Sequence, residues 1–474
     1  MLPVPLHRRL AGAPDRTDHA PVPAPSPEHP APTPPHAGQG PWWRVTGERV
    51  NAAFAQQRRI DPFGHTVHAW LGALACASVA APTSAVEFGA IGVVAAMLIR
   101  IHRHWRTLPL LFLQPLMLVL LAWTLLALAS RLWTLGPHDA WVDEFGVLRF
   151  GIVAAALWPV ADRRALLLGA LVFGFAVAQL SQVVHALGLA LEIDAMTWNR
   201  LPGRNSGWLD PVVGGSLLTA ALGLHLPAAL WGRGRWRVLG ALGSAATLLG
   251  ILATGTRGAW LAAAGLVGIA CVVAIARIKP RARLGRAVLI LLGVVAVGSA
   301  AAWLTVGDQL RARFDAGRAE ITGAIEHKEF QTDTGARLLM GWWALEALKE
   351  RPLGGTGVGG YEAWTRAHVE SQEIDPATRR FHAHAHNALL HAAAALGVPG
   401  LGLAIAFVAL AIIGSARRQS GDGPPGYADG PCFALVGLLL VSAFDSVHVN
   451  SQTGALLAVL LIFAVRSRPS EPRA

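Results

Sequence analysis

Apolar segments of membrane-spanning length recur along most of this chain, and they restrict its fold more than any other feature. A helix needs roughly 20 predominantly apolar residues to cross a bilayer. Candidate spans begin at residue 66 and lie near residues 66–82, 85–101, 108–130, 145–161, 165–190, 209–231, 237–254, 258–276, 287–306, 386–413, 431–447 and 451–466. Since lipid offers no hydrogen bonds to a backbone, such segments predict helices. We therefore expect an all-α, polytopic membrane protein with about 12 transmembrane helices, in which the short first and last pairs could each form a hairpin.

The composition agrees with a membrane protein and argues against nucleic acid as a partner. Hydrophobic residues make up 53% of the 474 residues and charged residues only 15%, less charge than a soluble protein of this length carries. The net charge of +11 comes from basic residues in short clusters between apolar segments, and no basic helix or aromatic platform stands outside them. The cysteines Cys76, Cys271 and Cys432 lie within apolar segments and predict neither a disulfide framework nor a metal site.

The distribution of arginine and lysine predicts the orientation of the helices. Alternate gaps between apolar segments are basic, namely those with Arg100, Arg103 and Arg106; Arg163 and Arg164; Arg233, Arg235 and Arg237; Arg277, Lys279, Arg281, Arg283 and Arg286; Arg417 and Arg418; and Arg466 and Arg468. Because positive charge stays on the cytoplasmic side of short loops, we expect a bacterial inner-membrane protein with both termini cytoplasmic. Long loops largely escape this rule, so the gap at 307–385 is expected on the periplasmic side.

These patterns divide the chain into five regions. We expect a disordered, Pro-rich cytoplasmic tail at 1–60, transmembrane helices 1–9 at 61–306, and a large periplasmic loop with amphipathic helices at 307–385. Transmembrane helices 10–12 at 386–466 and a cytoplasmic tail at 467–474 complete the chain. The Pro-rich tail lacks core-forming residues and could be dispensable or could bind a partner domain. No apolar segment precedes it, so no cleavable signal peptide is expected.

The predicted loop contains two helical stripes of apolar residues. Leu310, Phe314, Ile321 and Ile325 approximate the first, and Leu338, Trp342, Leu345 and Leu348 form the second, ended by Pro352. Such helices could lie on the membrane surface or pack on the helix bundle.

Two arginines at the predicted periplasmic face are candidates for binding an anion. Arg204 lies just before the sixth predicted helix, and Arg257 lies in the tight turn between the seventh and eighth. Arg257 breaks the positive-inside trend and has little loop around it. A guanidinium at the membrane boundary can snorkel to lipid headgroups, or it can bind phosphate oxygens bidentately.

A histidine cluster stands at the start of the tenth predicted helix, and it contains His382, His384 and His386, followed by Asn387. His382 and His386 would share one face if the helix already included them. No H-E-x-x-H zinc pattern is present, so we expect no metal. Histidine is the usual general base for a hydroxyl nucleophile, although such residues are also often plain hydrogen-bonding groups.

A glycine-rich segment, Gly355 to Gly360, resembles a phosphate loop in composition. It follows a helix stop at Pro352 and no strand precedes it, so a flexible turn is the better interpretation. A weaker possibility is that its amides contact an anion. No D-x-D pair occurs in a predicted periplasmic loop, which argues against a metal-dependent nucleotide-sugar transferase.

Four blocks in order resemble the O-antigen ligase and O-antigen polymerase family. They are Gly203–Pro211, Thr254–Ala264, Arg337–Tyr361 and His384–Gly400. The last block is the most specific, with His384-Ala385-His386-Asn387 followed by Leu390, Gly397, Pro399 and Gly400. The second block departs slightly, since Thr256 stands where serine is usual. The similarity covers residues 200–412 well, whereas the N-terminal third matches only in hydropathy.

The resemblance implies a metal-independent lipid-sugar glycosyltransferase of the GT-C type that needs no cofactor. It implies a donor glycan on undecaprenyl diphosphate, used at the periplasmic face, and lipid A–core as acceptor in the ligases. In the sibling polymerases the acceptor is another lipid-linked unit, and in protein O-oligosaccharyltransferases it is a Ser or Thr. We favour the ligase because one large loop precedes the tenth predicted helix and no soluble domain follows.

The implied chemistry assigns a role to each candidate residue. Arg204 and Arg257 would bind the donor diphosphate, and His386 would be the catalytic base for an inverting attack. His384, Arg337, Asn387 and Tyr361 are secondary candidates. A transporter or lipid flippase is a more distant alternative, for which midplane charges and inverted repeats would be expected.

Overall fold

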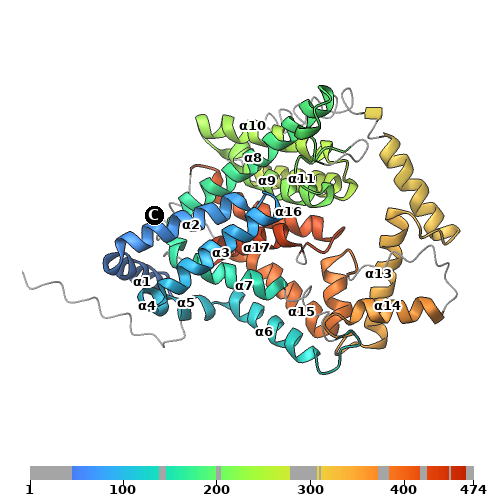
Figure 1. The fold of residues 1–474 in the computed structure, drawn as a ribbon, viewed down its shortest axis with the longest axis horizontal. Coiled ribbons are helices and arrows are strands. Elements are labelled where there is room, and N and C mark those ends of the chain that lie inside the picture. Colours follow the sequence, from blue (N-terminus) through green and yellow to red (C-terminus); the bar gives the residue numbers. More distant parts are fainter. Residues whose placement is uncertain are drawn as a thin grey trace, which may run out of the picture. The chain divides into compact units, whose positions relative to one another are not determined.

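The structure is a computed structural model, and it describes residues 45–137, 146–198, 204–277, 307–308, 311–371, 384–416, 424–447 and 450–465. Every element in these residues is helical, and no strand occurs among them (Figure 1). The predicted all-α fold class is therefore confirmed for this part of the chain. The predicted span at 287–306 and the candidate His382 lie outside the described residues.

Eleven of the predicted spans coincide with helices of the described chain. The helices are α2 (Pro62–Ser78), α3 (Thr83–Ile99), α5 and α6 (Leu108–Phe112 and Pro115–Ser130), α7 (Gly146–Leu157), α8 (Arg164–Ala190), α9 (Pro211–Trp231), α10 (Arg235–Ala253), α11 (Arg257–Ala276), α15 (Ala388–Ala416), α16 (Gly430–Ser442) and α17 (Ser451–Ala464). By length and composition, five of the described helical segments could cross a membrane, or six if a bent pair counts as one span. The structure thus supports a multi-pass membrane protein, and the number of twelve spans stays a prediction.

Helix α9 is the central helix of the bundle, and most of its length is buried. It approaches α16 closely because small residues face each other at the contact. A Cβ on Gly223 would lie 2.5 Å from the backbone nitrogen of Ala434, and one on Gly437 would lie 2.9 Å from the carbonyl oxygen of Thr219. Small residues are the usual means by which membrane helices pack backbone to backbone.

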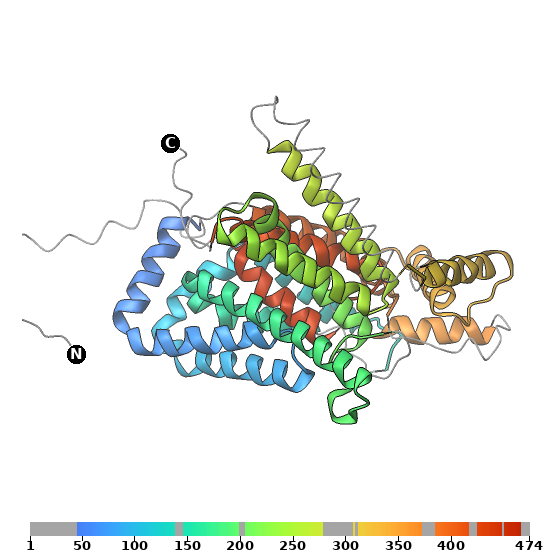
Figure 2. The same cartoon turned by 90° about the horizontal axis from the view of Figure 1, so that it is seen from above.

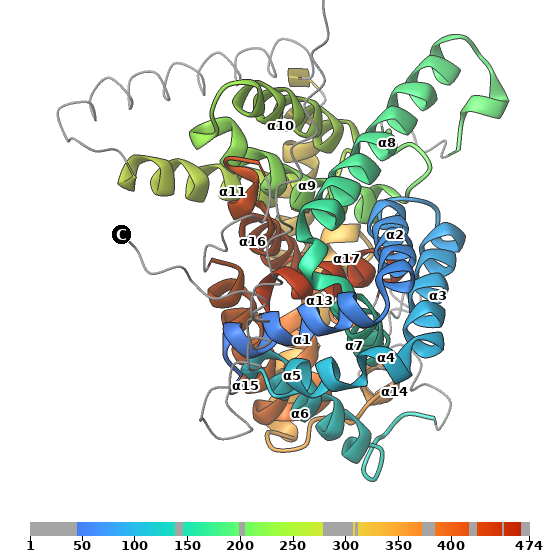
Figure 3. The same cartoon turned by 90° about the vertical axis from the view of Figure 1, so that its left-hand side faces the viewer.

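The predicted tail boundary at residue 60 is wrong in position, because residues 47–60 form the helix α1 (Gly47–Ile60). This helix lies across the ends of the bundle helices (Figure 3). Phe54 is 2% exposed, and its ring lies 5.2 Å from the ring of Trp158. Arg58 forms an ion pair with Asp162 at 2.7 Å. The proline run dominates the composition of residues 1–60, whereas the buried positions Val50 and Phe54 of α1 follow from its packing on the bundle.

The two ends of the bundle differ in chemistry, and we call them the basic end and the loop end. The basic end contains α1 together with the arginine-rich starts of α8 and α10. The start of α8 also lies beside the end of α17, since Arg164 donates a hydrogen bond of 2.5 Å to the carbonyl oxygen of Phe463. The loop end carries α13 (Asp333–Glu350), α14 (Gly360–Ser371) and the helical residues 311–326, which project beyond the bundle (Figure 2).

The two helices expected in the loop are present, but the second buries a different face. Helix α13 buries Leu339, Met340, Trp343, Ala344 and Ala347 against α14 and the start of α15. The predicted stripe of Leu338, Trp342 and Leu345 is exposed instead, with Trp342 63% exposed. An exposed apolar stripe on an amphipathic helix agrees with a position on a membrane surface rather than in the bundle.

The glycine-rich segment is a packed turn at a break in α15. Gly397 has φ 68° and ψ −164° inside α15, and Pro399 has no N–H to donate. This break leaves the carbonyls of Ala394 and Ala395 without their usual helical donors. The amides of Thr356 and Gly357 donate to these two carbonyls, each at 2.9 Å. A phosphate loop would need these backbone amides to donate to an anion. Here they donate hydrogen bonds to carbonyl oxygens of the protein instead.

Candidate functional site

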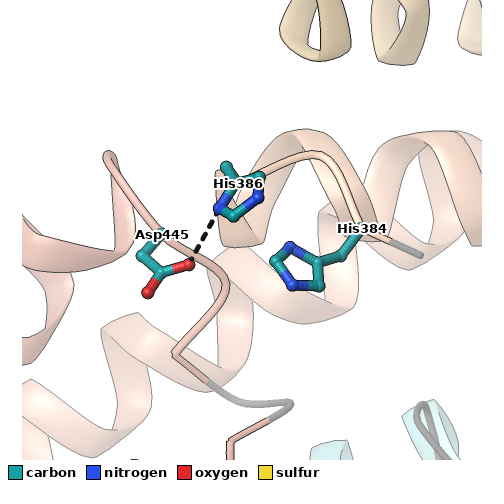
Figure 4. A group of neighbouring side chains, drawn as sticks. All are labelled: His384, His386 and Asp445. Carbon is teal, nitrogen blue, oxygen red and sulfur yellow. Dashed lines mark hydrogen bonds and ion pairs between the residues drawn. The ribbon is translucent and has the colours of Figure 1, made fainter. Parts of the chain in front are cut away.

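A histidine–aspartate pair stands where α15 begins and α16 ends. Nδ1 of His386 lies 3.2 Å from a carboxylate oxygen of Asp445 (Figure 4). The side chains are 14% and 21% exposed. Burial alone would raise the pKa of the Asp445 carboxyl, but the hydrogen bond and charge of His386 hold that pKa below its ordinary value. The carboxylate therefore accepts a hydrogen bond from Nδ1–H, and in this tautomer of the imidazole the lone pair lies on Nε2.

Local geometry positions His386 just outside the helix. It has a φ of 47°, an uncommon value for a residue other than glycine. Asn387 follows, and its side-chain oxygen accepts hydrogen bonds from the amides of Leu389 and Leu390 at 3.1 and 3.0 Å. These are the contacts of a helix N-cap. Because α15 begins at Ala388, His386 precedes this helix, and the expected pairing with His382 falls outside the described residues.

A second layer of aromatic groups supports the pair. The rings of His384 and His386 are 4.3 Å apart, and the ring of His391 lies 6.5 Å from that of His384. Tyr361 is fully buried, stands edge-on to His391 at 5.8 Å, and donates a hydrogen bond of 2.6 Å to the carbonyl oxygen of Met340. Burial raises the pKa of Tyr361. Tyr361 therefore belongs to the core beneath the histidines.

The predicted arginines lie close to a third arginine that the sequence did not single out. Arg257 is the first residue of α11, and its Nη1 contacts the carbonyl oxygen of Arg313 at 3.5 Å. Burial lowers the pKa of Arg313, and the charges of Arg204 and Arg257 lower it further. The structure thus brings Arg204, Arg257 and Arg313 within electrostatic range of one another.

The segment that carries Arg204 is held against the turn before α11. The amide of Asn205 donates to the carbonyl oxygen of Ala253 at 2.7 Å, and Nδ2 of Asn205 donates to that of Gln182 at 2.9 Å. On the other side of the turn, the hydroxyl of Thr256 donates to the carbonyl oxygen of Pro211 at 2.8 Å. The hydroxyl of Thr256, which replaces the usual serine of the family block, thus fastens the two arginine-bearing segments to each other.

Glu320 is the acidic partner of this arginine cluster. Nη2 of Arg257 donates to both of its carboxylate oxygens at 3.0 and 2.9 Å, and the amide of Thr334 donates to one of them at 3.2 Å. Burial would raise the pKa of Glu320, but these hydrogen bonds and the charge of Arg257 leave it lowered. The carboxylate is consequently ionised at neutral pH.

The arginine cluster and the histidine–aspartate pair lie at the same end of the bundle. The link between them is the packing of α11 on the end of α16. A Cβ on Gly258, the residue after Arg257, would lie 2.8 Å from the Cβ of Phe444, the residue before Asp445. The residues next to Arg257 and to Asp445 therefore pack against each other at this end of the bundle.

The remaining candidates are placed differently. Asn387 caps α15 and donates to the carbonyl oxygen of Ala443 at 3.1 Å. Arg337 is half-buried on α13. Asp445, like Arg313 and Glu320, is not among the residues predicted from the sequence. It is a lone acid at the end of an apolar segment, and an isolated acid in such surroundings is a functional candidate by default.

The histidines and Asp445 also satisfy the distance requirement for a metal site. Ligand atoms of His384, His386 and Asp445 all lie within 4.8 Å of one another. A metal bound by Nδ1 of His386 and the carboxylate of Asp445 would have to replace the proton that these two atoms share. Acid–base chemistry keeps this proton in place.

An apolar cavity runs from this end of the bundle along α15. Its lining comes from α6, α15, α16 and α17 and includes Leu389, Phe407, Ile412, Val447 and Leu457. Leu389 follows the N-cap Asn387, and Val447 lies two residues beyond Asp445. Its lining residues on α15 fall in two groups, Ala388 and Leu389 before the break at Gly397 and residues between Ala404 and Ile412 after it.

The helices and the site define a class, namely multi-pass membrane proteins with a cationic and histidine-bearing centre at one end of the bundle. Residues 242–405 match the family model described as O-antigen ligase. This segment, about a third of the chain, includes Arg257, Arg337, Tyr361 and the histidine block, and it is similar to the O-antigen ligase family. The family resemblance predicted from the sequence is confirmed. A search of curated proteins gives no match.

Proposed function

We propose that the chain is an O-antigen ligase that transfers a glycan from undecaprenyl diphosphate to lipid A–core at the periplasmic face of the inner membrane. The observation that carries this proposal is the approach of two different groups at one end of the bundle. The arginine cluster suits an anionic leaving group, and the His386–Asp445 pair suits a hydroxyl nucleophile. The packing of Gly258 against Phe444 brings the two together.

His386 acts as the general base in this mechanism. Its Nε2 takes the proton of the acceptor hydroxyl while the hydroxyl oxygen attacks the anomeric carbon of the donor glycan. The new carbon–oxygen bond forms as the bond to the diphosphate breaks, and the anomeric centre inverts. Asp445 orients the ring through Nδ1 and stabilises the imidazolium that results. His384 lies beside this ring and is proposed to orient the acceptor.

The arginines stabilise the diphosphate that leaves. Polyprenyl diphosphate departs as an anion, so cations rather than a strong acid are required. Arg204 and Arg257 supply them without a metal, because guanidinium groups match phosphate oxygens in geometry and charge. Arg337 is a secondary candidate for holding the loop or a phosphate.

The apolar cavity along α15 is the proposed place for the polyprenyl chain of the donor. In this donor the apolar chain begins directly after the diphosphate, so it must enter the membrane close to the bond that is broken. In lipid A–core, several core sugars separate the acceptor hydroxyl from the acyl chains. A cavity that starts next to Asn387 and the turn of Asp445 therefore suits the donor better than the acceptor.

The proposed topology has twelve spans in a GT-C type arrangement, with a periplasmic loop at 307–385 and both termini cytoplasmic. The positions of charged residues support this orientation. Arg164 and Arg277 mark the basic end, where Arg277 forms an ion pair with Asp429 at 2.8 Å. All the proposed site residues belong to the opposite end. Positive charge at the basic end agrees with a cytoplasmic position.

A deletion strain tests the function and separates the ligase from its siblings. Loss of long-chain lipopolysaccharide with accumulation of lipid-linked polymer is expected for a ligase. Loss of polymer length would instead indicate a polymerase, and unmodified exported protein would indicate protein O-glycosylation. Complementation with Arg257→Ala and Arg257→Lys tests the site, since lysine restores charge but not bidentate geometry and should rescue only in part.

A further inference from the structure

Three residues on one face of the helical residues 311–326 meet the side chain of Arg257. Arg313, Gly317 and Glu320 are four and three residues apart, which places them on one side of a helix. The carbonyl of Arg313 and the carboxylate of Glu320 accept hydrogen bonds from the guanidinium. A Cβ on Gly317 would lie 2.6 Å from Nη1 of Arg257. Phe314, on the same helix, lies 6.3 Å from the ring of Trp260 on α11.

The contacts of Glu320 are those that a phosphate group would make. Its two carboxylate oxygens accept from a guanidinium nitrogen, and one of them also accepts from the backbone amide of Thr334 in the first turn of α13. Guanidinium groups and amides at a helix start are typical ligands of phosphate oxygens. The carboxylate of Glu320 thus occupies a place where a phosphate group could bind.

The charges near this position are close to balanced as long as Glu320 is present. The groups that act on Arg313 are the cations Arg204 and Arg257 and the anions Glu320 and Asp333. Counting Arg313, three positive charges face two negative ones. Withdrawal of Glu320 would leave two uncompensated positive charges, and a diphosphate diester carries one negative charge on each phosphate. The site without Glu320 therefore matches the charge of the donor.

We infer that Glu320 is the resident anion of the donor site and that a donor phosphate displaces it from Arg257. This inference rests on the proposed function. In the empty site, Glu320 neutralises the arginines and keeps the helix of residues 311–326 against the start of α11. When the donor binds, phosphate oxygens take over Nη2 of Arg257 and the amide of Thr334. Glu320 moves away with its helix, because its negative carboxylate and the negative phosphate would repel each other.

Loss of the Glu320 carboxylate changes donor affinity in opposite directions, depending on whether Glu320 holds Arg257 in place or competes with the donor. If Glu320 held Arg257 in its binding geometry while the donor was present, loss of the carboxylate would weaken binding. If Glu320 competes with the donor, loss of its charge removes the competitor and strengthens binding. The apparent dissociation constant rises with the fraction of protein in the blocked state, so the direction of the change distinguishes the two roles.

The experiment measures binding of undecaprenyl diphosphate to the full chain in nanodiscs. Glu320→Gln should bind this probe about fivefold more tightly than the wild type, which corresponds to about 1 kcal/mol. Glu326→Gln, at an exposed position on the same helix, is the matched control and should bind like the wild type. Equal or weaker binding by Glu320→Gln, with a normal control, would overturn the inference.

Two further variants keep the outcome decisive. Gly317→Ala pushes a methyl group against Arg257 while the carboxylate remains, so it should also tighten binding. If Glu320→Gln does not fold, this variant decides, and unchanged or weaker binding refutes the exchange. Arg257→Ala tests the donor site itself and should bind at least tenfold more weakly. Normal binding by Arg257→Ala would refute the donor assignment, and the inference would fall with it.

Discussion

Replacement of Asp445 by asparagine tests whether the carboxylate serves catalysis through His386. Asparagine keeps the shape of the side chain but loses the charge, so it no longer fixes the tautomer or stabilises an imidazolium. We expect the rate of glycan transfer to fall and donor affinity to stay the same. The reason is that Asp445 contacts His386 and not the arginine cluster.

The size of the effect can be worked out from the geometry. The two side chains are only 14% and 21% exposed, and their contact is a hydrogen bond of 3.2 Å to an ionised carboxylate. Hydrogen bonds of this kind contribute about 1.5–3 kcal/mol. At about 1.4 kcal/mol for each factor of ten in rate, Asp445→Asn should slow transfer by about 10- to 150-fold.

The assay is a single-turnover measurement in nanodiscs with labelled lipid-linked glycan, made on Asp445→Asn, His386→Ala and the double variant. The double variant should be no slower than His386→Ala alone, because Asp445 acts only through that ring. Ser446→Ala is the control, since the amide of Ser446 and not its hydroxyl bonds Asp445. A further loss of rate in the double variant, or weakened donor binding by Asp445→Asn, would refute the reasoning.

Five other predictions concern the metal, the packing, the N-terminal tail and the response to pH. Activity of the purified protein should survive EDTA, and loss in chelator with recovery on magnesium or manganese would contradict this. Phe54→Ala should lower stability by about 3–5 kcal/mol, because the ring packs on Trp158, whereas deletion of residues 1–44 should leave transfer intact in the same assay. Gly357→Ala should unfold at a clearly lower temperature, since its φ is 80° and a Cβ would lie 2.4 Å from Cα of Thr134, while Gly402→Ala has open space and should not. The lowered pKa of Glu320 means that its ionised form adds stability above its unfolded pKa. This stability is lost as the pH falls through the folded pKa, so the difference in melting temperature between wild type and Glu320→Gln should be present at pH 7 and disappear once the carboxyl is protonated in the folded protein.

The sequence predicted the helices well because the constraint behind them is local. An apolar segment in lipid has to be helical whatever lies beside it, so the bounds expected for α8, α9 and α11 agree with the structure to within two residues. The helix α1 was not predicted, because its buried positions are revealed only by contacts with segments that are distant in sequence. Val50 and Phe54 are unremarkable in a polar segment until the packing on Trp158 is known.

The candidate site could be predicted only in part, for the same reason. Arg257 and His386 stand out in the chain because each is polar at the edge of an apolar segment. Arg313, Glu320 and Asp445 reach the site through contacts between segments that are far apart in sequence, such as the 59 residues between His386 and Asp445. Spacing along the chain carries no information on such contacts. The composition of the glycine-rich turn predicted a flexible segment, whereas its backbone hydrogen bonds fasten it to α15.

The turn at Gly355–Gly360 has a practical consequence for protein engineering. A glycine-rich stretch between helices is where one would ordinarily insert a tag, a reporter or a fusion domain, because exposed turns tolerate insertion. Here an insertion would separate the amides of Thr356 and Gly357 from the carbonyls of Ala394 and Ala395. These carbonyls at the break in α15 would then lack hydrogen-bond donors, and lipid supplies none. Topology reporters placed in this turn would register misfolded protein rather than the side of the membrane on which the native turn lies.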